Sequence, residues 1–160
     1  MAVAMFSIAA SAQVYVGGSL SVWNDDDADK TGFFIAPEVG YNINSNWAVG
    51  IELAYADKNA SSYGASTFAV SPYARYTYFN QGVVSLFVDG GFSYATIDAD
   101  GVDDGFNIGL KPGFAVKLSD KFSLVSKFGF LGYASDYPNV GTGFGLDFTN
   151  NVSFGFFVNF

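Results

Sequence analysis

The C-terminal stretch from Phe144 to Phe160 restricts the fold of this chain more than any other feature of the sequence. Every second residue, beginning with Phe144, is large and apolar, and Asn150 is the one polar residue in that set. The residues between them are mostly Gly, Ser, Thr, Asn or Asp. A period of two places one set of side chains on each face of a β-strand. Because the alternation never slips, it predicts one long strand that ends at the last residue.

Short turn-like links alternate with longer polar links along the rest of the chain. This arrangement is typical of an antiparallel up-and-down barrel with tight turns at one end and longer loops at the other. A cut at residues 149–151 would give nine strands, but the unbroken alternation favours eight. The predicted strands cover residues 14–23, 32–43, 47–57, 66–79, 83–97, 105–118, 122–134 and 143–160, and the short links are 44–46, 80–82 and 119–121.

Bulky apolar side chains share one face of these strands, whereas the other face holds glycine, serine and charged residues. The interior of an eight-stranded barrel is only just wide enough for side chains, so the bulky face is predicted to point outward, into lipid. A soluble lipocalin-like carrier would point it inward and is the less favoured alternative. The predicted outward set is Val14, Val16, Leu20, Phe33, Ile35, Val39, Trp47, Val49, Ile51, Leu53, Tyr55, Phe68, Val70, Tyr76, Tyr78, Leu86, Val88, Phe92, Tyr94, Phe106, Ile108, Leu110, Phe114, Phe122, Leu124, Phe128 and Phe130.

The composition agrees with a membrane barrel. Aromatic residues make up 19% of the chain and charged residues only 14%, whereas soluble domains carry about 25% charged residues. The sequence contains no apolar run of about 18 residues that would form a transmembrane helix. The aromatic residues near the short links suggest a girdle at the membrane boundary; they are Tyr41, Trp47, Tyr76, Tyr78 and Phe122.

The stretches Tyr15–Leu20, Ala36–Tyr41, Phe87–Phe92 and Lys127–Tyr133 resemble the small eight-stranded barrels related to outer-membrane proteins X and A. They are most similar to outer membrane beta-barrel, or porin-family, proteins of the Bacteroides group. The resemblance implies an all-β, eight-stranded antiparallel up-and-down transmembrane barrel in the outer membrane of a Gram-negative bacterium. The protein would be a monomer surrounded by lipid and lipopolysaccharide. The residues that resemble the terminal signal read by the barrel-assembly machinery are Phe154, Phe156, Val158 and Phe160.

The first residues of the chain, Met1 to Ala12, are apolar or small and end in Ala10-Ser11-Ala12. That pattern is typical of the apolar region and cleavage site of a secretory signal peptide. Because the usual Lys or Arg at the front is missing, we interpret residues 1–12 as a truncated signal and residues 13–160 as the barrel domain. The alternative is an extension of the first strand.

The inward face is predicted to carry four acidic and four basic side chains. Charges in a narrow lumen must be paired and hydrogen-bonded, so the sequence predicts a salt-bridge network that fills it. Arg75 is expected to bind one carboxylate with two hydrogen bonds, and Glu38 and Asp89 are both candidates. A polar conduit for ions is the alternative interpretation. The eight residues are Glu38, Glu52, Asp89, Asp147, Arg75, Lys111, Lys117 and Lys127.

Proline recurs within three strands, at Pro37, Pro72 and Pro112. Because proline cannot donate to a ladder, we expect bulges or local gaps in pairing there.

Most of the net charge of −8 lies in two acidic runs of the longer links. Neither run fits a calcium-binding EF-hand loop, so solvated charge or weak divalent-cation binding are the two interpretations. The acidity argues against a nucleic acid partner. The candidate cation ligands are Asp25, Asp26, Asp27, Asp29, Asp98, Asp100, Asp103 and Asp104.

The chain contains neither cysteine nor histidine. We therefore expect no thiolate metal site, no cofactor and no enzyme that depends on a histidine for proton transfer. The predicted role is structural or interactive at the cell surface, in adhesion or envelope integrity. A narrow channel for ions or small solutes is the alternative.

Overall fold

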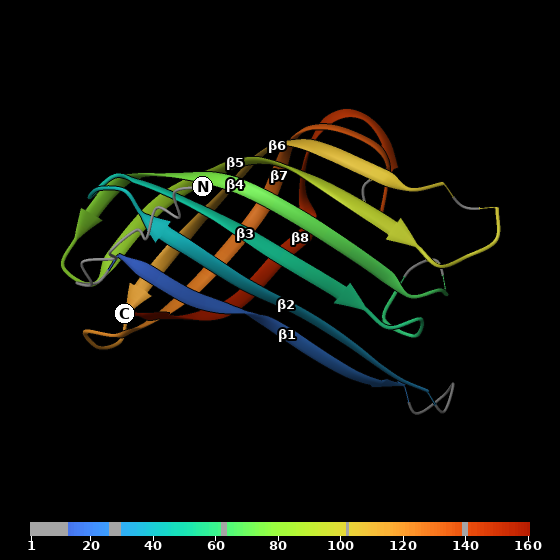
Figure 1. Cartoon of the computed structure of the whole chain (residues 1–160), viewed down its shortest axis with the longest axis horizontal. Helices are drawn as coiled ribbons and strands as arrows, with labels where there is room; N and C mark the ends of the chain where they lie inside the picture. The colour runs from blue at the N-terminus through green and yellow to red at the C-terminus, as the bar shows by residue number, and fades with distance from the viewer. Residues whose placement is uncertain (1–12, 26–29, 62–63, 102, 139–140) are drawn as a thin grey trace, which may run out of the picture.

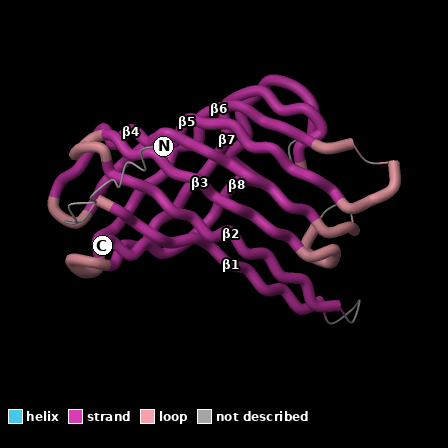
Figure 2. Tube along the Cα trace, viewed as in Figure 1, coloured by secondary structure: helices cyan, strands magenta, loops and turns pink. Residues whose placement is uncertain are grey.

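A computed structural model describes residues 13–25, 30–61, 64–101, 103–138 and 141–160 of the chain. It forms a closed barrel in which each strand is antiparallel to its neighbours (Figure 1). The described residues contain no helix that is long and apolar enough to cross a membrane. Figure 2 shows strands joined by loops. The strands are β1 (Val14–Asp25), β2 (Lys30–Asn42), β3 (Trp47–Ala56), β4 (Thr67–Gln81), β5 (Val84–Ile97), β6 (Gly105–Lys117), β7 (Phe122–Tyr137) and β8 (Gly141–Asn159).

The predicted fold class, strand number and strand order are confirmed. Tyr15 in β1 is paired with Asn159 in β8, so the barrel begins and ends at the same side. We call this side, with the links β2–β3, β4–β5 and β6–β7, the short-turn end, and the opposite side the loop end. The strands β1, β2, β7 and β8 reach further into the predicted loops 24–31 and 135–142 than the sequence pattern indicated. The signal-peptide prediction for residues 1–12 lies outside the described residues.

The large apolar side chains of the wall point outward, as predicted from their alternation. No helix packs over these side chains, because the described part of the chain consists of strands and loops. All five predicted girdle residues are exposed near the short-turn end, and the rings of Trp47 and Tyr76 lie 4.9 Å apart. The surface of the barrel is therefore an apolar belt with an aromatic border.

The prediction that Phe130 points outward is wrong. Its side chain is only 3% exposed and lies inside the barrel, whereas the next residue, Leu131, points outward. The cause is Gly129, which has a φ of 77° and sits at a register shift between β7 and β8. The one extra residue of β7 at this bulge reverses the alternation, so the outward set in the upper part of β7 is odd-numbered.

The three strand prolines interrupt pairing on one side, but only one of them shifts the register. Pairing between β2 and β3 skips Pro37, and pairing between β4 and β5 skips Pro72, with the register unchanged on either side. At Pro112 the register between β6 and β7 shifts between Leu110 and Gly113. The predicted local gaps are therefore present, and a bulge in β7 lies opposite Pro112.

Candidate functional site

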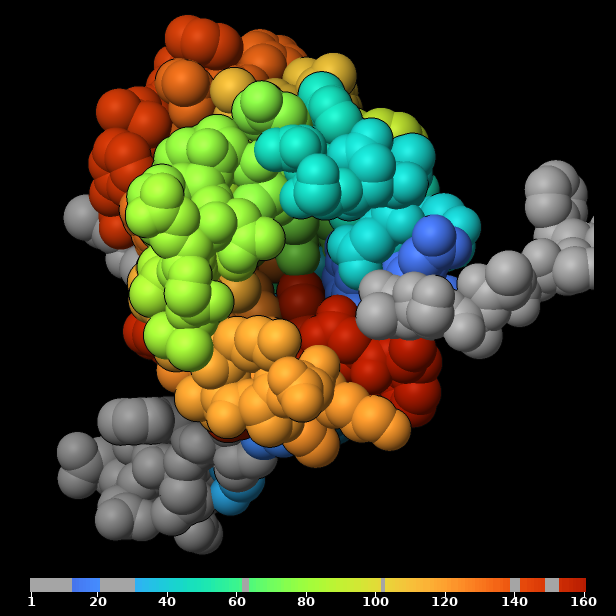
Figure 3. All heavy atoms as spheres, turned by 90° about the vertical axis from the view of Figure 1, so that its left-hand side faces the viewer, coloured from blue at the N-terminus to red at the C-terminus, as the bar shows by residue number. Residues whose placement is uncertain are grey.

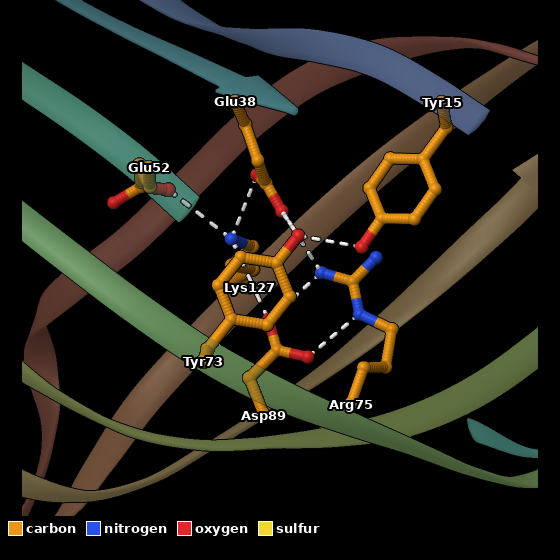
Figure 4. A network of polar contacts seen from close by, with 7 residues as sticks. All are labelled: Tyr15, Glu38, Glu52, Tyr73, Arg75, Asp89 and Lys127. Carbon is orange, nitrogen blue, oxygen red and sulfur yellow. Dashed lines mark hydrogen bonds and ion pairs between the residues drawn. The ribbon is translucent and has the colours of Figure 1, made fainter. Parts of the chain in front are cut away.

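The register of the sheet gathers charged side chains on the inward face. Arg75 in β4 is the register partner of Asp89 in β5, which in turn is the partner of Lys111 in β6. Glu38 in β2 and Glu52 in β3 are partners in the same way. Because the wall is closed, these two rows face each other across the lumen, as Figure 4 shows for most of their members.

Arg75 and Asp89 form the doubly hydrogen-bonded pair. The Nε atom of Arg75 lies 2.6 Å from Oδ1 of Asp89, and Nη2 lies 2.8 Å from Oδ2. Nη2 also lies 3.3 Å from Oε1 of Glu38. The sequence analysis named Glu38 and Asp89 as candidate partners of Arg75. Asp89 accepts two hydrogen bonds from the guanidinium, and Glu38 accepts one. The three side chains are almost fully buried, so solvent screens the pairs little.

Lys127 completes the charge network from the other side. Its Nζ atom lies 2.8 Å from Oε2 of Glu38, 3.1 Å from Oε2 of Glu52 and 3.5 Å from Oδ2 of Asp89. Glu38 and Asp89 are therefore each shared by both cations. The hydroxyl of Tyr73 donates a hydrogen bond to Oε1 of Glu38. Sharing of this kind compensates for the desolvation of buried charges, because no described buried side-chain nitrogen or oxygen lacks a partner.

Four aromatic side chains surround the Arg75 guanidinium inside the barrel, a layer that the sequence analysis missed. The guanidinium carbon lies 3.9 Å from the ring centre of Phe87, 5.2 Å from those of Tyr73 and Phe157, and 5.6 Å from that of Tyr15. The two tyrosine hydroxyls are 2.5 Å apart. Cation–π attraction holds the guanidinium among these rings.

Each of these rings fits because its register partner is a glycine. A Cβ atom at Gly40 would lie 2.1 Å from the Tyr15 ring, and a Cβ at Gly113 would lie 2.5 Å from the Phe87 ring. An inward-facing aromatic residue opposite an inward-facing glycine could have indicated this layer. That pairing can be recognised only when the register between the strands is known. The four pairs are Tyr15–Gly40, Tyr73–Gly50, Phe87–Gly113 and Phe157–Gly17.

Of the other three predicted lumen charges, Lys111 and Lys117 take no part in the ion pairs of the network. Lys117 is a correction: its side chain is 51% exposed at the end of β6, where Nζ lies 3.3 Å from Oδ1 of Asp120. Lys111 borders a cavity of about 30 Å³ and has no ion pair within 4.0 Å among the described residues. Asp147 is half-buried opposite Phe130.

A layer of neutral polar groups covers the network towards the loop end. The side chains of Ser71, Ser93 and Asn107 are buried and lie around the hydroxyl of Tyr137. Tyr137 follows Asp136, which has a φ of 50°, at a register shift between β7 and β8. The sequence analysis assigned Tyr137 to a loop and so missed it.

At the short-turn end the lumen widens into a cavity of about 440 Å³ that we call the vestibule. Figure 3 looks at this end and shows the recess between the strand ends. Arg75 and Phe87 form its floor, and amide and hydroxyl side chains make up most of its wall. None of the described residues that line it is acidic.

The whole chain, residues 1–160, matches the profile of the family described as "Outer membrane protein beta-barrel domain". The chain belongs to this family. Among solved structures it is similar to the N-terminal β-barrel domain of Pseudomonas aeruginosa OprF, with a TM-score of 0.64 and 12% sequence identity. The alignment covers 93% of this chain and 98% of that one, so the likeness shows the fold. A search of curated proteins finds no match.

The predicted terminal signal of this outer membrane beta-barrel domain lies on the outward face of β8. Phe154, Phe156 and Phe160 are exposed, and Val158 is partly buried. The backbone N–H of Phe160 donates to the carbonyl of Val14 at 2.9 Å, so the last residue takes part in barrel closure. Its role in assembly stays a prediction.

The acidic loop residues are the candidate cation ligands predicted from the sequence. Among the described residues, no group of three or more acidic side chains is placed to hold a metal ion. Asp104 accepts a hydrogen bond of 2.5 Å from Tyr94. Residues 26–29 and the side chain of Asp25 lie outside the described part, so cation binding there stays a prediction.

Proposed function

We propose that this protein is an outer-membrane barrel of a Gram-negative bacterium with a permanently filled lumen, and that it acts through its surfaces in adhesion or envelope integrity. The observation that carries the proposal is the network in which Arg75 and Lys127 share the carboxylates of Glu38 and Asp89. It occupies the centre of an eight-stranded lumen, where there is little room beside the side chains.

Family membership and the exposed apolar belt support the membrane location. A lipid bilayer covers such a belt, whereas water would leave it exposed. We place the short-turn end in the periplasm, so that the loop end faces lipopolysaccharide outside the cell. The acidic loop residues would then share divalent cations with the anionic lipid, and the aromatic C-terminus would be read by the barrel-assembly machinery. None of these roles involves catalysis or a resident cofactor.

A narrow channel is the second candidate function. The vestibule reaches the network from one side, and the 30 Å³ cavity beside Lys111 borders it from the other. Conduction would require Arg75 and Lys127 to leave their carboxylates, so the two cavities would join only in a rearranged state.

The surface role is tested in cells that lack the protein. Deletion is expected to raise sensitivity to detergents and large antibiotics or to lower attachment to surfaces, with rescue by the wild-type gene. A variant carrying Asp98→Asn, Asp100→Asn, Asp103→Asn and Asp104→Asn keeps the barrel and removes loop charge. If this variant restores detergent and antibiotic resistance but does not restore attachment, the acidic loops act in adhesion. Unchanged sensitivity and attachment in the deletion strain would contradict the proposal.

A further inference from the structure

The vestibule is large enough to hold a small organic molecule. Its volume of about 440 Å³ falls within the range of about 300–1,000 Å³ that is usual for ligand pockets. It lies on the short-turn side of the aromatic layer, and Figure 3 shows its mouth as the recess between the strand ends. The proposed surface role makes no use of this cavity. The chemistry of its lining indicates which class of molecule it binds.

Arg75 closes the inner end of the vestibule and is the one charged residue among the described residues that line it. Its guanidinium carries five N–H donors. Nε and Nη2 donate to Asp89 and Glu38, whereas Nη1 takes part in none of these bonds, and no dashed line reaches it in Figure 4. Arg75 borders neither of the smaller cavities beside the network, of about 30 and 10 Å³. The donors of Nη1 are therefore available to a molecule in the vestibule.

The buried ion pairs present their positive end to the vestibule. Glu38 and Asp89, which hold the guanidinium, are not among the described residues that line the cavity. Their negative charge lies behind the guanidinium, as seen from the vestibule. Because these side chains are almost fully buried, solvent screens the arrangement little. A guanidinium donates hydrogen bonds and accepts none, so this end of the cavity favours an anionic acceptor group.

The wall of the vestibule supplies hydrogen-bonding groups without adding charge. Amide and hydroxyl side chains, including those of Thr77, Ser85 and Asn159, line it. Such groups both donate and accept, so they match the hydroxyls or amides of a polar molecule. No described lining residue is acidic, whereas the acidic run that begins at Asp98 lies in the β5–β6 link at the loop end. The wall therefore accommodates an anion that the loop end would repel.

We propose that the vestibule binds a small organic carboxylate whose other polar groups are hydroxyls or amides. The carboxylate accepts charge-assisted hydrogen bonds from Nη1 of Arg75, and the remaining groups bond the wall. Asp89 and the ring of Phe87 hold the guanidinium in place before the ligand arrives, so little ordering is needed on binding. A periplasmic source for the ligand rests on the proposed membrane location, whereas binding itself does not.

Arg75 is the single arginine of the chain and is therefore its own probe. Protein that contains ¹⁵N-labelled arginine, folded in a non-ionic detergent, gives one side-chain Nε–H signal by NMR. Titration with N-acetyl-alanyl-alanine should shift this signal to saturation with a Kd of about 1 mM, as ordinary ligand efficiency predicts for a molecule of this size. The C-terminal amide of the same dipeptide lacks only the negative charge. It should bind at least about tenfold more weakly, because it loses the charge-assisted hydrogen bonds.

A second carboxylate in the wall should block the vestibule. Ser85→Asp introduces one, and like charges that share a small cavity repel, so the dipeptide should bind at least about tenfold more weakly. Ser119→Asp is the matched control, because it adds the same charge in the β6–β7 turn at the same end, and Ser119 is not among the described lining residues. It should keep the wild-type affinity. Ala115→Asp, at the register partner of Ser85, repeats the test if Ser85→Asp does not fold.

Three results would overturn the proposal. The first is an unchanged Arg75 signal at about 20 mM dipeptide, well above the expected Kd. The second is equal affinity for the dipeptide and its amide, and the third is wild-type affinity in both Ser85→Asp and Ala115→Asp, because binding would then lie elsewhere. These titrations use the detergent-folded protein, so their failure is distinct from absence of the protein from the outer-membrane fraction of cells, which would contradict the proposed location.

Discussion

The middle of the lumen and its short-turn end contrast in how their polar groups are satisfied. In the middle, Arg75 and Lys127 are held by shared carboxylates and by aromatic rings that fit over glycines. At the short-turn end, uncharged polar side chains line a vestibule of about 440 Å³ open to solvent. The difference indicates that the middle determines stability and closure, whereas the vestibule can change at little cost. Three predictions address this contrast, from the largest expected effect to the smallest.

Arg75→Leu should have the largest effect. It removes the cation that both Glu38 and Asp89 contact and leaves buried carboxylates with fewer partners. Breaking a buried ion pair from one side costs about 3–5 kcal/mol. Urea unfolding of the detergent-folded protein measures the loss, with Lys117→Leu as the control, because the exposed Lys117–Asp120 pair should contribute at most about 1 kcal/mol. Equal losses of unfolding free energy in both variants would contradict the claim that the buried network stabilises the barrel more than the exposed Lys117–Asp120 pair does.

Gly113→Ala should have an intermediate effect. The added methyl would lie 2.5 Å from the Phe87 ring and 2.7 Å from the backbone oxygen of Ser126, so the aromatic layer must shift. Overpacking of this kind costs about 1–3 kcal/mol. Gly145→Ala is the matched control, because no atom lies within 4 Å of its added Cβ and it should be neutral or slightly stabilising. Unfolding midpoints that do not separate the two variants would contradict the packing of Phe87 against Gly113.

Ser85→Ala in the vestibule should have the smallest effect. The hydroxyl of Ser85 donates to Oδ1 of Asn80 at 3.2 Å in an exposed position. Water can replace this hydrogen bond, so the free energy of unfolding should stay within about 0.5 kcal/mol of wild type. A loss near that of Gly113→Ala would mean that the vestibule wall is as important for stability as the layer above it.

Alternation along the strands was sufficient to predict the fold, the outward face and the meeting of opposite charges in the lumen. It was not sufficient where a single residue changes the alternation. Gly129 turns Phe130 inward, yet nothing local distinguishes it from the other glycines among the 19 in the chain. The choice of Asp89 over Glu38 as the bidentate partner of Arg75, like the aromatic layer, depends on cross-strand register. Register depends on the bulges and turns of the whole barrel.

Conductance through the purified wild-type protein in planar lipid bilayers tests the closed lumen most directly. Because the network and the aromatic layer fill the middle of the barrel, the baseline current should show no stable, voltage-independent steps. Arg75→Leu, if it inserts, should give more frequent current steps than wild type. Stable open channels in the wild-type protein would contradict a permanently filled lumen and favour the channel function.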